Sequence, residues 1–245
     1  MRPLKIHSVK KFLSAILTIV ILISCSNEPK NTHITGSVNG LKKGTLYLEK
    51  LQDSSFITLD SVVLKGTSEF NFSIQLESPE VVYMLLRKTE GTQIEDGIEI
   101  FAEPGTIEVY TSLENFENEA KVTGSLNHKK LVEYNKLMQR YSDRSLELFA
   151  DNIQAENNAD ELRKVEINKE YESLIKSKYM ATINFALNHK DLEVAPYLTL
   201  TEIFDANIKY LDTIYHSLNE KVKVSTYGKQ LETFIKERKQ LKEIE

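Results

Sequence analysis

Few side chains in this chain of 245 residues are spaced for catalysis or for binding a metal. None of the histidines after residue 32 forms a His-Glu-x-x-His motif or an i, i+4 pair, and no cysteine follows them. These histidines are His33, His128, His189 and His216. His189 lies where a predicted helix ends, a position that favours an imidazole electrostatically without any further role. The sequence therefore predicts no metal site and no bound cofactor.

A serine beside an aspartate, Asp60-Ser61, could suggest a nucleophile with its base. No Gly-x-Ser-x-Gly motif surrounds Ser61, and side chains of this kind at a strand edge usually bond to turn backbone. Glu103 precedes Pro104-Gly105, and this pair fits the two central positions of a turn. We therefore assign no catalytic residue. The sequence favours a non-catalytic protein and leaves enzymatic activity open.

Cys25 is the only cysteine, and it ends the run Leu-Ile-Ser-Cys at residues 22–25. A basic head and an apolar stretch at residues 12–23 precede it. This arrangement resembles the signal peptide and lipobox of bacterial lipoproteins. The resemblance implies that residues 1–24 are removed and that Cys25 receives a diacylglycerol and an N-acyl chain. An uncleaved membrane anchor, or an ordinary cleaved signal that leaves a free thiol, are the alternatives.

Two or more acyl chains anchor a protein firmly, so the expected partner at this end of the chain is a membrane. Residues 25–31 would be the lipidated cysteine and a short tether, which keeps the folded part close to the bilayer. The residue after Cys25 is Ser26, so the acidic residue that would retain a lipoprotein in the inner membrane is absent at this position. We therefore expect a protein of the bacterial cell envelope, lipid-anchored in the outer membrane and facing the periplasm.

The charge of the chain bears on its partners. From residue 25 on, 27 basic side chains stand against 36 acidic ones, a net charge of about −9. Nucleic acids attract clustered cations, so this acidic chain is not expected to bind them. With a single cysteine, no disulfide framework can form.

Residues 32–124 read as short strands separated by turns. Phe70 to Ile74 and Ile98 to Phe101 alternate apolar and polar residues, which is typical of a sheet with one buried face. Turn signals recur at Asn39-Gly40, Lys65-Gly66, Glu90-Gly91, Asp96-Gly97 and Pro104-Gly105. The pattern predicts an antiparallel β-sandwich or an open barrel.

Residues 125–245 show the helical period instead, with apolar residues recurring at Leu131, Tyr134, Met138 and Tyr141. We expect two long helices joined by a loop at residues 151–160, a helix that has Pro196 in its first turn, a helix at 208–218, and a last helix capped by Ser225. The fold class is therefore α+β, a β-sandwich domain followed by a helical domain. The junction is too short for a flexible linker, so the two parts should pack on each other.

The strand-rich half also contains several short sequence fragments whose order and spacing are characteristic. They are Ile-Thr-Gly at 34–36, Gly-Thr-Leu-Tyr-Leu at 44–48, Leu-Asp-Ser-Val-Val at 59–63, Phe-Asn-Phe at 70–72, Pro79, Phe-Ala-Glu-Pro-Gly-Thr-Ile at 101–107 and Val-Thr-Gly-Ser at 122–125. Together they resemble the uncharacterised domain that precedes the thioredoxin-like domain in many thiol–disulfide lipoproteins of Gram-negative bacteria. The helical half is similar to the segment that follows in those proteins.

The Cys-x-x-Cys of the thioredoxin-like domain is absent from this sequence, so we expect no thiol–disulfide exchange by the chain itself. The leading hypothesis is a non-catalytic envelope lipoprotein that binds or scaffolds a partner. One alternative is an accessory subunit to a thioredoxin-like lipoprotein supplied in trans. Another is a lipoprotein that binds a glycan or a small ligand.

Overall fold

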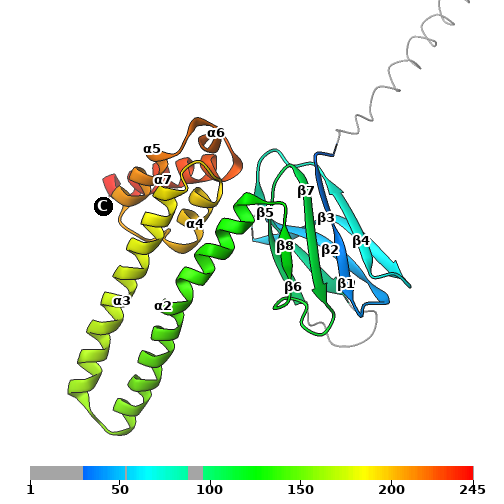
Figure 1. The fold of residues 1–245 in the computed structure, drawn as a ribbon. Coiled ribbons are helices and arrows are strands. Elements are labelled where there is room, and N and C mark those ends of the chain that lie inside the picture. Colours follow the sequence, from blue (N-terminus) through cyan, green and yellow to red (C-terminus); the bar gives the residue numbers. More distant parts are fainter. Residues whose placement is uncertain (1–29, 53, 88–95, 245) are drawn as a thin grey trace, which may run out of the picture. The chain divides into compact units, whose positions relative to one another are not determined.

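The computed structural model describes residues 30–52, 54–87 and 96–244 (Figure 1). From Asn31 on, the chain forms one compact unit. Its first part holds eight strands in the described residues, arranged as two four-stranded sheets with the orders β4-β1-β7-β8 and β3-β2-β5-β6. The strands are β1 (Thr32–Asn39), β2 (Lys43–Gln52), β3 (Ser55–Lys65), β4 (Glu69–Ile74), β5 (Glu80–Arg87), β6 (Asp96–Ala102), β7 (Gly105–Ser112) and β8 (Lys121–Thr123).

The inner faces of the two sheets form one apolar core. Leu46 and Leu48 of β2, separated by one residue, are fully buried there together with Phe72 of β4 and Ile107 of β7. Burying alternate side chains of each strand removes a large apolar area from water, which is the main stabilising contribution to such a sandwich. The predicted sandwich is confirmed, and its sheets are open rather than closed into a barrel.

Two details of the predicted sheets are wrong. The pairing of β1 with β7 is parallel, with Ile34 opposite Ile107, although the other described pairings are antiparallel. Asp96-Gly97 does not form a turn but lies in β6, paired with β5. The predicted turns at 39–40, 65–66 and 104–105 are confirmed, whereas Glu90-Gly91 lies outside the described residues.

Strand β5 does not alternate apolar and polar residues, because helices cover its outer face as well. Val82 points into the sandwich core, while its neighbour Val81 packs with helical residues in a second cluster. A strand that is buried on both faces reads as a continuous apolar run, which periodicity does not distinguish from a helix.

The second part of the unit contains six described helices, α2 (Leu126–Asn157), α3 (Glu161–Asn188), α4 (Val194–Glu202), α5 (Ile208–Ser217), α6 (Glu220–Lys223) and α7 (Thr226–Ile244). The predicted loop at 151–160 is wrong: α2 continues through Asn157, and only residues 158–160 connect it to α3. The exposed face of a helix can carry polar residues such as those at 151–157. Asp151 in this stretch pairs with Arg163 of α3 at 3.0 Å. Within the described chain, no helix is both long and apolar enough to cross a membrane.

The two parts meet through shared packing and a tight junction. Val81 and Phe101 of the sheets contact Leu131, Tyr134 and Leu198 of the helices in one buried cluster. Gly124, just before α2, has a φ of +90°, and a Cβ there would lie 2.2 Å from the carbonyl oxygen of Thr106. Only glycine, which has no Cβ, allows the backbone to come this close to Thr106, so the direction in which the chain enters α2 is fixed. The expected packing of the two parts on each other is confirmed.

Candidate functional site

A cavity of about 460 Å³ lies where the loops of the sandwich face the starts of three helices. The β4–β5 loop contributes residues 77–79, the β6–β7 turn contributes residues 103–104, and the helical part contributes the first turn of α2, the α3–α4 connection and the α6–α7 region. The cavity is lined by both parts of the unit, so its shape depends on how they pack.

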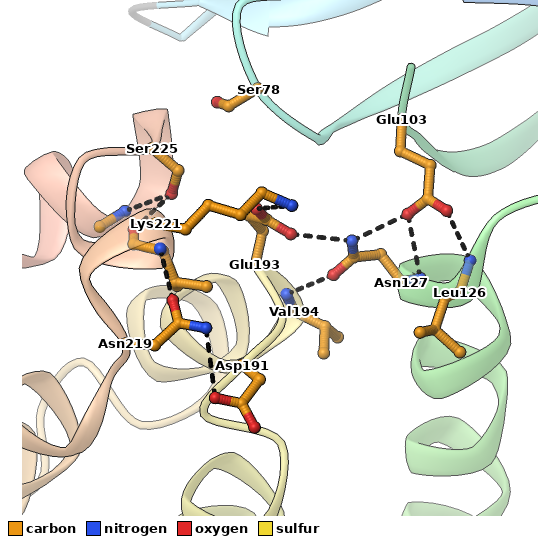
Figure 2. Close-up of polar contacts among 12 residues, drawn as sticks. Ser78, Glu103, Leu126, Asn127, Asp191, Glu193, Val194, Asn219, Lys221 and Ser225 are labelled. Carbon is orange, nitrogen blue, oxygen red and sulfur yellow. Dashed lines mark hydrogen bonds and ion pairs between the residues drawn. The ribbon is translucent and has the colours of Figure 1, made fainter. Parts of the chain in front are cut away.

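Asn127, in the first turn of α2, bridges two carboxylates at one side of this cavity (Figure 2). Its Nδ2 donates to Glu103 Oε2 at 2.9 Å and to Glu193 Oε2 at 3.0 Å, and its Oδ1 accepts from the backbone N–H of Val194 at 2.9 Å. Glu103 Oε1 also accepts from the N–H of Leu126 at 2.8 Å. Glu103 therefore caps α2, and a single amide joins the sandwich to the starts of α2 and α4.

Glu193 is the exceptional member of this network because one of its oxygens accepts no hydrogen bond. The residue is only 1% exposed, and Oε1 is buried without a hydrogen-bond donor in the described part of the chain. The ammonium of Lys221 lies 3.9 Å from that oxygen, which is an ion pair but is too long for a hydrogen bond. The side chain of Lys221 is 78% exposed, so the pair is held weakly at the mouth of the cavity.

Hydroxyl groups close the other side of the cavity. Ser78 Oγ lies 2.9 Å from Thr226 Oγ1 and accepts from the N–H of Thr226 at 3.0 Å. Ser225 caps α7 as predicted, accepting from the N–H of Gly228 at 3.2 Å while it donates to the carbonyl of Val222. These serines satisfy helix and loop backbone, so neither is poised as a nucleophile.

An aromatic cluster beside the cavity carries its own polar contacts. The rings of Phe101, Tyr197 and Tyr227 pack with centroids 5.1 to 5.8 Å apart. Tyr197 donates to Glu99 Oε1 at 2.9 Å, and the hydroxyl of Tyr227 accepts from the N–H of Val81 at 3.0 Å. Burial raises the pKa of Glu99, and burial with the neighbouring Glu99 charge raises the pKa of Tyr197. The cluster attaches α4 and α7 to the outer face of the sheet.

The residues weighed from the sequence are dispersed over the fold. Asp60 lies in β3, where its carboxylate accepts from the N–H groups of Ser61 at 2.8 Å and Ser73 at 3.2 Å, a structural role. Glu103 also has a structural role, as the cap of α2. His189 is the C-cap of α3, as predicted, with Nδ1 2.8 Å from the carbonyl oxygen of Phe185.

The remaining histidines are equally separate. His128 is buried, its Nδ1 accepts from the N–H of Phe101 at 3.3 Å, and burial lowers its pKa. His33 contacts Ser73, and His216 pairs with Asp212 at 3.6 Å. Over the described ranges, no group of three His, Cys, Asp or Glu side chains could hold a metal ion. Cys25 lies outside the described residues.

Among the residues that line the cavity, Asn127, Glu193 and Lys221 carried no signal in the sequence. Asn127 and Glu193 are 66 positions apart, and Lys221 follows on a short helix that the sequence analysis did not predict. Only the packing of the helical part against the sandwich brings them together.

Comparison with known proteins identifies part of the chain. Residues 32–131 match the model of a domain of unknown function, DUF4369. The match spans the described strands of both sheets and extends into α2 as far as Leu131, whose side chain packs against Val81 and Phe101. The chain therefore contains a DUF4369 domain, and the match includes the start of α2, which packs on the outer face of the sheet. Neither the curated proteins nor the solved structures gave a significant match to the chain.

Proposed function

We propose that this protein is a non-catalytic binding module, anchored by lipid on Cys25 in the bacterial cell envelope, and that the junction cavity holds its ligand. The leader and the cysteine at residues 1–25 support the anchor. The observation that carries the binding role is Glu193, which lines a cavity of about 460 Å³ and whose buried Oε1 lacks a hydrogen-bond donor among the described residues. A buried carboxylate in this state is stabilised by any ligand that brings a donor to it.

The charges around the cavity favour a ligand with an ammonium group. Glu77 lines the same cavity, whereas Glu103 has both oxygens engaged by α2. An ammonium that enters beside Glu193 can donate the short, charge-assisted bond that Lys221 at 3.9 Å does not make. Lys221 would swing into solvent, which its exposed side chain permits. Leu126, Leu192 and Val224 of the lining can contact an apolar portion of the ligand.

The binding test is a thermal-shift titration with spermidine, n-butylammonium and glycylglycine. Sodium chloride at matched ionic strength is the control. The lipid-anchored protein should gain stability with an amine, and Lys221→Ala should gain it at lower concentration because no internal ammonium competes. Lys229→Ala, on the exposed face of α7, should behave as the wild type. A shift that survives in Glu193→Gln, or no shift with any amine, would refute the cavity as the amine site.

The anchor is tested separately. Cys25→Ala should move the protein from the membrane fraction to the soluble fraction, and the mature wild type should lack residues 1–24 by intact-mass measurement. Retention of the variant in the membrane fraction would mean that the apolar leader is itself the anchor. Fractionation of inner and outer membranes by density would test the expected outer-membrane position.

The resemblance of the strand-rich half to domains that precede thioredoxin-like domains supports a second candidate function. In this candidate, the chain is an accessory subunit that binds a thioredoxin-like lipoprotein in trans. Cross-linking in intact cells, followed by mass spectrometry for a Cys-x-x-Cys lipoprotein, tests this candidate. A glycan ligand remains the third candidate, and envelope polysaccharides belong in the same thermal-shift panel; absence of any shift with them removes it.

A further inference from the structure

The chain enters the folded unit at the same end of the sandwich as the junction cavity (Figure 1). Asn31, just before β1, donates from Nδ2 to the carbonyl of Leu76 at 2.8 Å, and its Oδ1 accepts from the N–H of Leu76 at 3.0 Å. Its own carbonyl accepts from the N–H of Gly105 at 2.9 Å. Leu76 and Gly105 are next in sequence to Glu77 and Pro104, which line the cavity. The start of the fold is therefore fixed beside the cavity.

This position matters because of the lipid anchor that we proposed on Cys25. The six residues from Ser26 to Asn31 span at most about 20 Å even when fully extended. A group that belongs to the membrane surface is then within reach of the cavity, and the tether gives it a high effective concentration there. A molecule in solution has no such advantage.

The charged groups at the mouth of the cavity fit a zwitterion. Among the described lining residues, Lys221 is the one basic side chain, and its ammonium lies 3.9 Å from Glu193 Oε1 (Figure 2). When a ligand ammonium takes this place, Lys221 loses its partner, so an anionic group on the same ligand can pair with it. Glu77 is exposed at the rim and repels an anion, which directs the anionic group toward Lys221. The cavity therefore favours a ligand with an ammonium and an anion a few bonds apart.

The mouth of the cavity also exposes apolar surface. Leu126 and Val224 belong to the lining, yet they are 50% and 63% exposed. Exposed apolar side chains beside a polar pocket fit a ligand that has an apolar portion next to its charged groups, as a bilayer lipid has. From residue 25 on, the chain has 27 basic and 36 acidic side chains. It therefore repels a lipid with an anionic headgroup, but it does not repel a zwitterionic one.

We propose that the ligand of the junction cavity is the phosphoethanolamine headgroup of a bilayer lipid, an inference that rests on the ammonium site and the lipid anchor proposed above. The ammonium donates to Glu193 Oε1, the phosphate pairs with Lys221, and the glycerol and upper acyl carbons contact Leu126 and Val224. The anchor and the headgroup then hold the same end of the sandwich at the membrane. A soluble phosphoethanolamine ester offers the same charged groups without the acyl chains, so the test must separate these two sources.

The first experiment compares glycerophosphoethanolamine with n-butylammonium, which has no phosphate, in thermal-shift titrations of residues 26–245, which include the entire compact unit. Lys221→Ala should weaken the binding of glycerophosphoethanolamine by up to about fivefold, because the phosphate loses its partner. The same variant should strengthen the binding of n-butylammonium, and Lys229→Ala should change neither. If Lys221→Ala strengthens both, or if only n-butylammonium binds, the headgroup is wrong and the amine site stands. If no amine binds, the amine site itself is refuted.

The second experiment separates a bilayer lipid from a soluble ester. Without its own lipid, the chain of residues 26–245 should float with vesicles of phosphatidylethanolamine and phosphatidylcholine in equal parts. It should not float with phosphatidylcholine alone, whose quaternary ammonium has no N–H to donate to Glu193. Val224→Ser should reduce flotation yet still bind glycerophosphoethanolamine, since Val224 is exposed. Equal flotation with both vesicles, or binding of glycerophosphoethanolamine without flotation, would overturn the bilayer lipid; the second result would assign the cavity to a soluble ester.

Discussion

Replacing Asn127 with alanine should destabilise the protein by about 3–5 kcal/mol. The side chain is 1% exposed and makes three hydrogen bonds, two to the carboxylates of Glu103 and Glu193 and one from the N–H of Val194. Alanine removes all three at once. Glu193 would then keep only the distant Lys221 as a partner for its buried charge.

The magnitude follows from these contacts. Hydrogen bonds to a charged group contribute about 1.5–3 kcal/mol each, and a neutral one about 1 kcal/mol. The two carboxylate bonds and the bond from Val194 therefore sum to several kcal/mol. Leaving a buried charge without its partner costs about 3–5 kcal/mol by itself. The first sum is about 4–7 kcal/mol, so the two estimates overlap at about 4–5 kcal/mol, within the expected loss.

Urea unfolding at pH 7, followed by far-UV circular dichroism, measures this loss. Asn135→Ala is the matched control, since Asn135 is an exposed asparagine on the same helix. Its replacement should change stability by less than about 1 kcal/mol, toward higher stability, because alanine is the better helix former. Equal stabilities for the two variants would refute the reasoning that the Asn127 bridge holds the sandwich and helices together.

Two further changes test the junction, and a third tests the packing of α7 on α6. Burial lowers the pKa of His128 from 6.5, so its contribution to stability is present above pH 6.5 and is lost as the pH falls toward its lower folded value. The wild type should therefore lose stability relative to His128→Gln in urea titrations over that window, and parallel pH profiles would contradict this. Burial raises the pKa of Glu99 above its usual 4.5, so the carboxyl is mostly protonated at pH 4.5 and becomes ionised as the pH rises. Tyr197→Phe removes a donor to this carboxyl and should therefore cost more stability as the pH rises from 4.5; a cost that does not change with pH would contradict this. Gly228→Ala should lower the melting temperature although alanine favours helices, since its Cβ would lie 2.0 Å from the carbonyl oxygen of Val222, and an unchanged or higher melting temperature would refute the clash.

Local signals in the sequence were sufficient wherever the neighbours of a residue along the chain decide its structure. Ser225 before a helical stripe predicted the start of α7, and the pairs at 39–40, 65–66 and 104–105 predicted turns, because caps and turns depend on a few adjacent residues. The alternation at Phe70 to Ile74 likewise indicated a strand with one buried face. The α+β class and the order of its two parts followed from these periods.

Local signals failed where distant segments decide. Strand β5 gave no alternation because helices cover the face that carries Val81, and residues 151–157 read as a loop although α2 continues through them. The parallel pairing of β1 with β7 joins residues more than seventy positions apart, and no turn chemistry encodes it.

The sequence by itself therefore determined the fold class, the turns at 39–40, 65–66 and 104–105, and the caps Ser225 and His189. Its leader and Cys25 predict the membrane anchor. The tertiary structure alone decided where the polar groups meet. Asn127, Glu193 and Lys221 are ordinary surface residue types, and only the packing of the helices on the sandwich removes Glu193 from water and leaves one oxygen without a donor. Burial depends on contacts between segments far apart in the chain, so the cost of an unsatisfied charge appears only once the fold is complete.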